Sequence, residues 1–418
     1  MVRIGIVGGS RILNAHLQGF AQLRAAGVDD FRITALTARV RDDALMFRQR
    51  GAGPPPRPPV MDPATGDPLA APHTYVSDFQ PDVLPEVYTD YAAMIADGAV
   101  DAVLDTTTLA LHHQVADVAF AHGKHLLTQK PLAVSVRAGR RMVDDARARG
   151  LTLGVFENVR QMRLVRAAAW AVQHGLIGTP QLAILGSLGG VWSPDKVVAD
   201  TPWRHQKLLA GGGGTLDIGV HQFDWLRAVM GEVNAVFGVV RAFEPTRRRV
   251  VGGVTEAIHA DVDDTYLATA YLDHDAVGQL LWSWAGRGEP VTLPDTPAFL
   301  GSEGGIHGGW LVRGGQREDL LARFEADMTA DERARWFPLG LREPYAILQH
   351  DWLKAIAAGT DPETSGTEGL RDLACAFGVI EASALGRVVS VDEVLSGAVD
   401  GYQRGIDAHY GLLAAGRG

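Results

Sequence analysis

Residues 3–27 read RIGIVGGSRILNAHLQGFAQLRAAG, and this stretch decides the fold. Its first five residues form a mostly apolar run, typical of a buried strand, which stops at Gly8, Gly9 and Ser10. Beyond this glycine turn the apolar residues recur every three or four positions, which is the spacing of a helix that buries one face. The stretch therefore predicts a strand, a tight turn and a helix.

The same alternation continues to residue 158. Further strands are expected at 31–38, 100–108, 124–128 and 151–157, with helices at 42–51, 112–123 and 137–150. Strands that alternate with helices and are almost wholly apolar indicate a parallel sheet covered on both faces. Residues 1–158 are therefore predicted to form an α/β dinucleotide-binding domain with a Rossmann-type, doubly wound parallel sheet.

One segment of this half, residues 51–85, breaks the pattern. It begins GAGPPPRPPVMDP and is too rich in proline for a helix or a central strand. We interpret it as an inserted loop. Loops of this length are uncommon in compact domains unless they cover a site, contact another subunit or are disordered, and all three alternatives remain open here.

After residue 158 the pattern changes. A helix at 164–178 is followed by strands at 181–190, 235–243, 263–273 and 276–286, and helices return at 344–359 and 369–389. Successive strands without helices between them predict an antiparallel sheet. Residues 159–418 are therefore expected to form an α+β domain for substrate binding and oligomerisation, with a large, open, mostly antiparallel sheet. An uncovered apolar sheet face commonly meets a second subunit, so we expect a homodimer or homotetramer.

Composition excludes several classes of protein. The chain has 39 Lys and Arg against 49 Asp and Glu, and a net charge of −10 argues against a nucleic-acid partner. Cys375 is the only cysteine, so neither an intrachain disulfide nor a cysteine metal site is expected, and the histidines lack partners for a metal site. The sequence lacks a signal-peptide pattern and an apolar run of about 18 residues. We expect a cytoplasmic protein without a membrane partner.

The first glycine turn is the expected cofactor site. Free backbone N–H groups and the helix dipole favour a pyrophosphate at such a turn. The predicted cofactor-binding residues here are Gly8, Gly9, Ser10, Arg11 and Ile12. The alternative is a tight turn with no ligand.

The end of the second expected strand bears on the choice between NAD and NADP. An NAD site normally has a carboxylate here for the adenosine ribose, but Thr37 and Arg39 precede the first acid, Asp42. A hydroxyl beside arginines suits a 2′-phosphate, so the segment favours NADP over NAD. The alternative is that Arg39 and Arg41 are solvated.

Residues 211–221, GGGGTLDIGVH, contain a candidate acid-base pair. Asp217 and His221 are four residues apart, so one helix would present both on the same face. A carboxylate beside a histidine can orient it for proton transfer from an alcohol. A helix cap, a buried salt link or a metal site are the alternatives for this pair.

Several motifs together resemble the Gfo/Idh/MocA oxidoreductases, a family that includes glucose-fructose oxidoreductase and inositol dehydrogenases. Besides the glycine turn, they are TTTLALHH (106–113), QKP (129–131), Trp203-Arg204, GGGGTLDIGVHQFD (211–224) and SGTEGLRDLACAFGVIEAS (365–383). The resemblance implies that NAD or NADP binds in the N-terminal domain and that a sugar, inositol or related polyol binds against the C-terminal sheet.

The resemblance also implies a role for each matching residue. In this reading His221 removes the hydroxyl proton during hydride transfer, Asp217 orients His221, and Lys130 stabilises the reacting oxygen. Pro131 resembles a proline that often follows a cis bond in this family. Further cofactor contacts are expected from Thr107, Thr108, His112, Gln129 and Lys130. Substrate contacts are expected from Lys130, Asn158, Arg160, Trp203, Arg204, Asp217 and His221.

The sequence departs from the family pattern at three places. Gln129 replaces a glutamate, Ser10 and Leu13 replace glycine or alanine, and Thr108-Leu109 replace Pro-Asn. Two other functions therefore remain open. One is an enzyme that keeps its cofactor bound and uses transient oxidation to cleave a glycoside or ether bond. The other is a sensor that binds the cofactor without catalysis.

Overall fold

The computed structural model of the chain describes residues 1–59, 62, 64, 66–189, 201–251, 253–286 and 289–413. Contacts divide the chain into two compact units. The first unit comprises Met1–Leu132, Arg141–Gln161 and Asp331–Glu368. The second comprises Ala133–Arg140, Met162–Ala330 and Gly369–Gly418. This division differs from a single cut after residue 158, because residues 331–368 return to the first unit.

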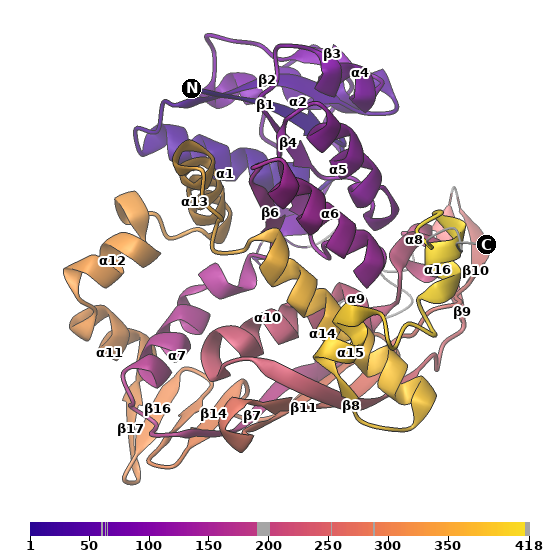
Figure 1. The fold of residues 1–418 in the computed structure, drawn as a ribbon. Helices are drawn as coiled ribbons and strands as arrows, with labels where there is room; N and C mark the ends of the chain where they lie inside the picture. Colours follow the sequence, from indigo (N-terminus) through magenta and orange to yellow (C-terminus); the bar gives the residue numbers. More distant parts are fainter. Residues whose placement is uncertain are drawn as a thin grey trace. The chain divides into compact units, whose positions relative to one another are not determined.

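A six-stranded parallel sheet forms the centre of the first unit, in the order β3-β2-β1-β4-β5-β6 (Figure 1). Its strands are β1 (Val2–Val7), β2 (Phe31–Thr37), β3 (Glu86–Tyr88), β4 (Ala102–Asp105), β5 (His125–Gln129) and β6 (Leu153–Phe156). Val7 pairs with both Thr37 and Asp105, so the carboxyl ends of the three inner strands meet at one edge. The order is that of a doubly wound dinucleotide-binding sheet, which confirms the predicted fold class.

Several helices belong to the same unit as this sheet. They are α1 (Leu13–Ala25), α2 (Arg41–Arg48), α3 (Val76–Phe79), α4 (Tyr91–Ala96), α5 (His112–Ala121), α12 (Ala330–Trp336) and α13 (Pro344–Ala358), while α6 (Val136–Ala148) contributes residues to both units. Helix α1 buries Leu13, Leu17 and Phe20, as its periodicity predicts. Gly19 lets α13 approach closely, since a Cβ at Gly19 would lie 2.4 Å from Gln349 Oε1. This contact draws α13 into the first unit.

The second unit is built on one large sheet, in the order β17-β16-β15-β14-β7-β12-β11-β8-β18, with β13 also paired to β7. Its strands are β7 (Pro180–Leu188), β8 (Val233–Arg241), β11 (Thr265–Leu272), β12 (Val277–Ser283), β13 (Val291–Thr292), β14 (Ala298–Gly301), β15 (Gly305–His307), β16 (Trp310–Arg313), β17 (Gln316–Asp319) and β18 (Val389–Ser390). Gly190, in the strand expected at 181–190, lies outside the described residues. All pairs except β7–β12 are antiparallel, which confirms the predicted sheet.

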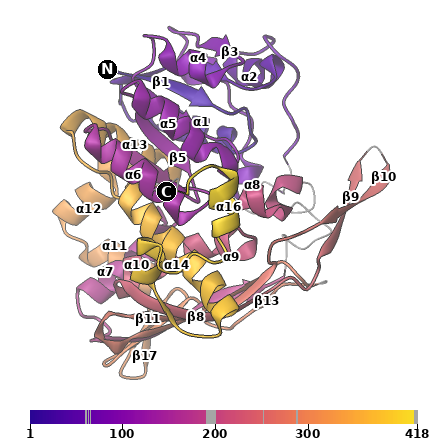
Figure 2. The same ribbon diagram turned by 45° about the vertical axis from the view of Figure 1, so that its right-hand side comes forward.

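Helices lie along one face of this sheet, as Figure 1 shows for α7, α10 and α14. The helices of this part are α7 (Arg163–Gln173), α8 (Lys207–Ala210), α9 (Gly214–Asp217), α10 (Gly219–Met230), α11 (Leu320–Asp327), α14 (Gly366–Leu385), α15 (Val391–Ser396) and α16 (Arg404–His409). A separate two-stranded ribbon, β9 (Thr246–Val251) and β10 (Val254–His259), extends away from the large sheet in Figure 2. Among the described residues, no helix is both long and apolar enough to cross a membrane.

Candidate functional site

The first glycine turn lies where β1, β2 and β4 end. Gly8 has a φ of 108°, a conformation that favours glycine, and its N–H donates to the Thr37 carbonyl over 2.8 Å. A Cβ at Gly8 would lie 2.7 Å from Thr106 Oγ1, so a side chain does not fit. The Ser10 hydroxyl donates to the Thr106 carbonyl over 3.1 Å. These contacts hold the turn against both neighbouring strands.

The turn has free donors for an anion. Within the described part of the chain, the backbone N–H groups of Gly9, Ser10 and Ile12 donate to no protein acceptor. They lie directly before α1, where the helix dipole also favours negative charge. The Arg11 guanidinium donates to the Pro58 carbonyl of the insertion. The turn therefore fits the pyrophosphate of a dinucleotide, although only Gly8 matches the glycine pattern.

The end of β2 presents one available cation. The Thr37 hydroxyl is buried and donates to the Met94 sulfur over 2.8 Å, so it is already engaged inside the unit. Arg41 donates to the Val87 carbonyl over 3.2 Å. Arg39 is exposed, and its guanidinium has no partner among the described residues. Of these three side chains, Arg39 is the one free to meet a phosphate.

His112 ties together the loops that follow β4 and β5. It is buried, with Nδ1 3.0 Å from the Pro131 carbonyl and Nε2 3.4 Å from the Thr107 carbonyl. The Lys130–Pro131 peptide bond is cis, as the resemblance implied. Thr107 N–H donates to Asp105 Oδ1 over 2.9 Å, and Thr108 directly precedes a 3-10 turn. The contacts of His112 indicate that it positions the two loops.

Gln129, the last residue of β5, contacts a residue that the sequence analysis did not select. Its Nε2 lies 2.5 Å from Nε2 of His16, a fully buried residue of α1. Burial lowers the pKa of His16 to about 3, so the imidazole is neutral at neutral pH and can accept this hydrogen bond. The only sequence feature that could have identified His16 is its position as a polar residue on the apolar face of the helix expected after the first glycine turn.

His16 makes the stability of the first unit sensitive to acid. Between pH 6.5 and about 3 the unfolded chain binds a proton at His16 that the folded chain excludes. The free energy of unfolding is therefore unaffected by protonation of His16 above pH 6.5, and it falls as the pH drops below that value. From pH 7 to pH 5 the loss is about 2 kcal/mol. We expect His16→Gln to show a correspondingly smaller fall in unfolding free energy, measured by denaturant titration at both pH values.

The matched control for this measurement is His122→Gln, because His122 is exposed at the end of α5. This variant should keep the full pH dependence of the original protein. An identical fall in the His16→Gln variant and the original protein would contradict the assignment to His16.

The remaining predicted residues of the first unit follow β5 and β6. Lys130 and Asn158 are half-buried. Arg160 also contacts the returning segment, since it forms an ion pair with Glu368 at 3.2 Å and donates to the Glu363 carbonyl over 3.4 Å. These two contacts link Arg160 to the end of that segment.

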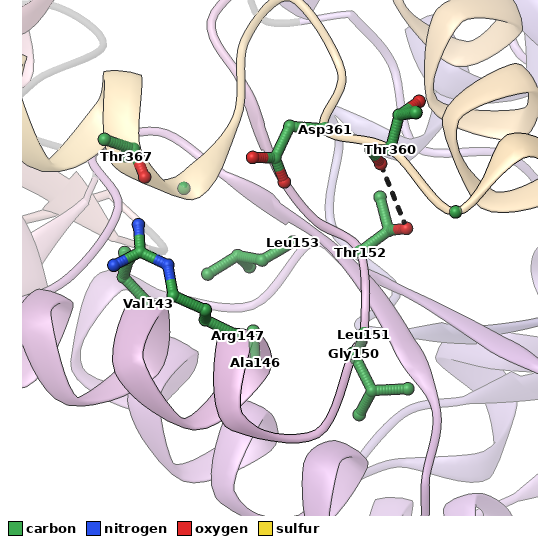
Figure 3. A pocket seen from close by; sticks show the side chains of 12 residues that line it. Val143, Ala146, Arg147, Gly150, Leu151, Thr152, Leu153, Thr360, Asp361 and Thr367 are labelled. Carbon is green, nitrogen blue, oxygen red and sulfur yellow. Dashed lines mark hydrogen bonds between the residues drawn. The ribbon is translucent and has the colours of Figure 1, made fainter.

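The first unit also contains a cavity of about 250 Å³ (Figure 3). Its lining includes Arg147, Thr152, Leu153 and Asp361. Leu153 begins β6, so the cavity lies at the amino end of that strand, whereas ligands of such sheets bind at the carboxyl ends. None of its lining residues was predicted as a site residue. Nor do three His, Cys, Asp or Glu side chains in the described ranges form a group that could hold a metal ion.

The glycine run of the second unit is held by a buried carboxylate. Asp263 accepts hydrogen bonds from the N–H groups of Gly213 and Thr215 and from the Thr215 hydroxyl, each over 2.8 Å. A Cβ at Gly213 would lie 1.7 Å from the Asp263 carbonyl oxygen, so only glycine allows this approach. Burial raises the pKa of Asp263, although its three donors oppose that shift. Asp263, which the sequence analysis did not select, therefore positions the start of α9.

Asp217 and His221 occupy two consecutive helices, which corrects the expectation of one helix. Asp217 ends α9 and His221 lies on α10, with Ile218 between them. Asp217 Oδ2 accepts a hydrogen bond from Arg204 Nε over 3.2 Å, and the Arg204 guanidinium lies 4.4 Å from the centre of the Trp203 ring. Arg204 therefore contacts both Trp203 and Asp217.

Two family models match the sequence. "GFO/IDH/MocA C-terminal domain" matches residues 165–307, and "Oxidoreductase family, NAD-binding Rossmann fold" matches residues 73–157, together more than half of the chain. The chain belongs to the Gfo/Idh/MocA oxidoreductase family. Similar members include levoglucosan dehydrogenase of Pseudarthrobacter phenanthrenivorans, 26% identical over 336 residues that cover 73% of this chain and 84% of the relative.

Another similar Gfo/Idh/MocA member is myo-inositol 2-dehydrogenase of Thermotoga maritima. It is 28% identical over 396 residues, which cover 94% of this chain and 100% of the relative. Among solved structures, levoglucosan dehydrogenase in complex with NADH and L-sorbose superposes with a TM-score of 0.70 and 21% identity, covering 95% of this chain and 100% of that one. This likeness confirms the two-part Gfo/Idh/MocA fold.

Proposed function

We propose that this protein is an NAD(P)-dependent dehydrogenase or reductase that transfers a hydride between nicotinamide and a hydroxyl-bearing or carbonyl carbon of a sugar, inositol or related polyol. The observation that carries the proposal is the first glycine turn, whose free N–H groups lie at the carboxyl edge of a doubly wound sheet. The named relatives support the substrate class, since they act on levoglucosan and myo-inositol.

The cofactor, when bound, supplies the nicotinamide carbon that accepts or donates the hydride. We assign its pyrophosphate to the N–H groups of Gly9, Ser10 and Ile12. Arg39 is the residue we assign to a 2′-phosphate, and on this basis we propose a preference for NADP. Thr107, Thr108, Gln129 and Lys130 follow β4 and β5 at the same edge of this sheet, and we assign them to the rest of the cofactor.

The chain's own residues supply the proton chemistry. During oxidation His221 takes the hydroxyl proton, and during reduction it returns that proton. The Lys130 ammonium donates a hydrogen bond to the reacting oxygen and stabilises its developing negative charge. Asp217 keeps His221 oriented, and the ion pair of Asp217 with Arg204 holds the Asp217 side chain in place. Trp203 and Asn158 complete the assigned substrate contacts.

Assembly through the large sheet is part of the proposal. On the face opposite the helices, apolar side chains of neighbouring strands are exposed, among them Phe237 and Val239 of β8 and Leu267 and Tyr271 of β11. An exposed apolar sheet face favours contact with a second copy. We therefore propose a homodimer or homotetramer. We also propose a cytoplasmic location, where the lone buried thiol of Cys375 stays reduced.

Titration of the purified protein with NAD, NADH, NADP and NADPH tests this function, followed by an absorbance screen at 340 nm with sugars and inositols. We expect cofactor binding and a substrate-dependent absorbance change. Failure to bind any of the four dinucleotides would contradict the proposal. Tight binding with release of a glycone and no net absorbance change would favour the bond-cleaving alternative. Binding with neither change would favour the sensor.

A further inference from the structure

The proline-rich insertion, residues 51–85, is docked on the two helices beside the first glycine turn. On α1, Gln18 Nε2 donates to the Pro72 carbonyl over 3.0 Å. On α2, His73 Nε2 lies 3.0 Å from the Met46 carbonyl, and its ring stacks on Phe47 with 5.0 Å between ring centres. The insertion therefore bridges the helices that follow β1 and β2.

Arg57 brings the insertion to the turn itself. Its Nη1 donates to the Gly9 carbonyl over 2.9 Å, and its Nη2 pairs with the Asp43 carboxylate of α2. The neighbouring Pro58 carbonyl accepts the hydrogen bond from Arg11. A Cβ at Gly9 would lie 2.7 Å from the Asp43 carbonyl oxygen, so the start of α2 lies directly against the turn. The Arg57 guanidinium thus connects the first glycine turn to α2.

The position of Asp43 gives this ion pair a consequence for the cofactor. Helix α2 follows the end of β2, where a doubly wound sheet receives the adenosine ribose. An unpaired Asp43 carboxylate would repel a 2′-phosphate there and would not repel an unphosphorylated ribose. The Arg57–Asp43 pair is about one-third exposed on each side, and exposed pairs contribute little to stability. Neutralising the Asp43 carboxylate therefore affects ligand binding more than it affects the stability of the fold.

We propose that Arg57 is a cofactor-specificity residue, which neutralises Asp43 beside the glycine turn and so allows the 2′-phosphate of NADP(H) to bind near Arg39. This inference rests on the proposed function. The inference assigns to the insertion a role in selecting NADP(H). Among the three alternatives for residues 51–85, it favours a loop that covers a site.

Direct binding of NADPH and NADH to the full chain, measured by calorimetry, tests the inference. Arg57→Gln should weaken NADPH binding about tenfold and NADH binding less than about threefold. Adding Asp43→Asn to Arg57→Gln should restore most of the NADPH affinity, because the repelling charge is then gone. Arg57→Lys keeps the charge and should keep the preference. Thermal melting confirms that each variant is folded.

The matched control is Arg50→Gln. Arg50 is an exposed arginine that pairs with Asp78 at 3.3 Å, so its loss removes the same charge without touching the turn. This variant should bind both cofactors as the original protein does. Equal weakening of NADPH and NADH by Arg57→Gln, or no weakening, would overturn the inference. Binding of NADH alone by the original protein would overturn this inference and the proposed NADP preference while leaving the proposed hydride transfer intact, and binding of neither cofactor would overturn all three.

Discussion

Replacing His221 by alanine is expected to lower kcat by about a hundred- to ten-thousandfold, because the variant lacks the group that exchanges the hydroxyl proton. The dissociation constants of the nicotinamide cofactors should remain unchanged, since His221 is assigned to the proton and not to the dinucleotide. Steady-state kinetics with the substrate found by the absorbance screen, together with cofactor titration, measure both effects. A shift of activity towards higher pH would accompany the loss, as solvent hydroxide replaces the missing base.

The control for this prediction is His122→Ala, which removes an exposed imidazole at the end of α5. Its kinetics should match those of the original protein. Turnover that stays essentially unchanged in the His221 variant would contradict the proposed proton transfer. Lys130→Ala provides a second check on the same mechanism, because losing the charge at the reacting oxygen should also lower kcat.

Replacing Arg227 by methionine is expected to destabilise the second unit by about 3–5 kcal/mol, because the change leaves a buried carboxylate unpaired. Arg227 of α10 donates from Nη1 to Asp372 Oδ1 of α14 over 2.7 Å, and their side chains are 2% and 3% exposed. Arg227 also pairs with Glu232 at 2.9 Å. Chemical denaturation followed by circular dichroism measures the loss. Because α10 carries His221, partial loss of activity should accompany it.

A second variant identifies the cause of this destabilisation. Adding Asp372→Leu to Arg227→Met removes the unpaired charge and should recover most of the lost free energy. Arg323→Met is the control, because its ion pair with Asp327 is 42% exposed on both sides and should be worth less than about 1 kcal/mol. A loss of similar size in the Arg227 and Arg323 variants would contradict the role of burial.

In the structure, two predicted site residues have partners within the protein. The resemblance assigns Arg160 to the substrate, and in the structure its guanidinium also contacts Glu368 and the Glu363 carbonyl. Thr37 was selected for the cofactor, yet its hydroxyl is buried against Met94. Thr37 is the last residue of β2, and Arg160 lies in a 3-10 turn shortly after β6. The sequence places a residue at a strand end, but the partner of its side chain depends on segments that arrive from elsewhere in the chain.

Local sequence patterns predict most of the secondary structure and both sheet types of this protein. The buried run from Ile4 to Val7, the glycine turn and the periodicity of α1 predict a strand, a turn and a helix, because each pattern involves residues only a few positions apart. Repetition of that pattern predicts the doubly wound sheet. The succession of strands expected at 235–243, 263–273 and 276–286, without helices between them, likewise predicts the antiparallel sheet.

Tertiary structure alone decided which distant groups meet. Asp263 lies 50 residues from Gly213, Arg57 lies 48 residues from Gly9, and Gln349 lies 333 residues from His16. The short strands β14 to β17 and the β9–β10 ribbon were also absent from the sequence prediction. Contacts at such separations depend on the path of the whole chain, since a buried donor takes whichever acceptor the fold brings near. The sequence therefore determined the layers and the candidate chemistry, while the fold chose the partners that hold those groups in place.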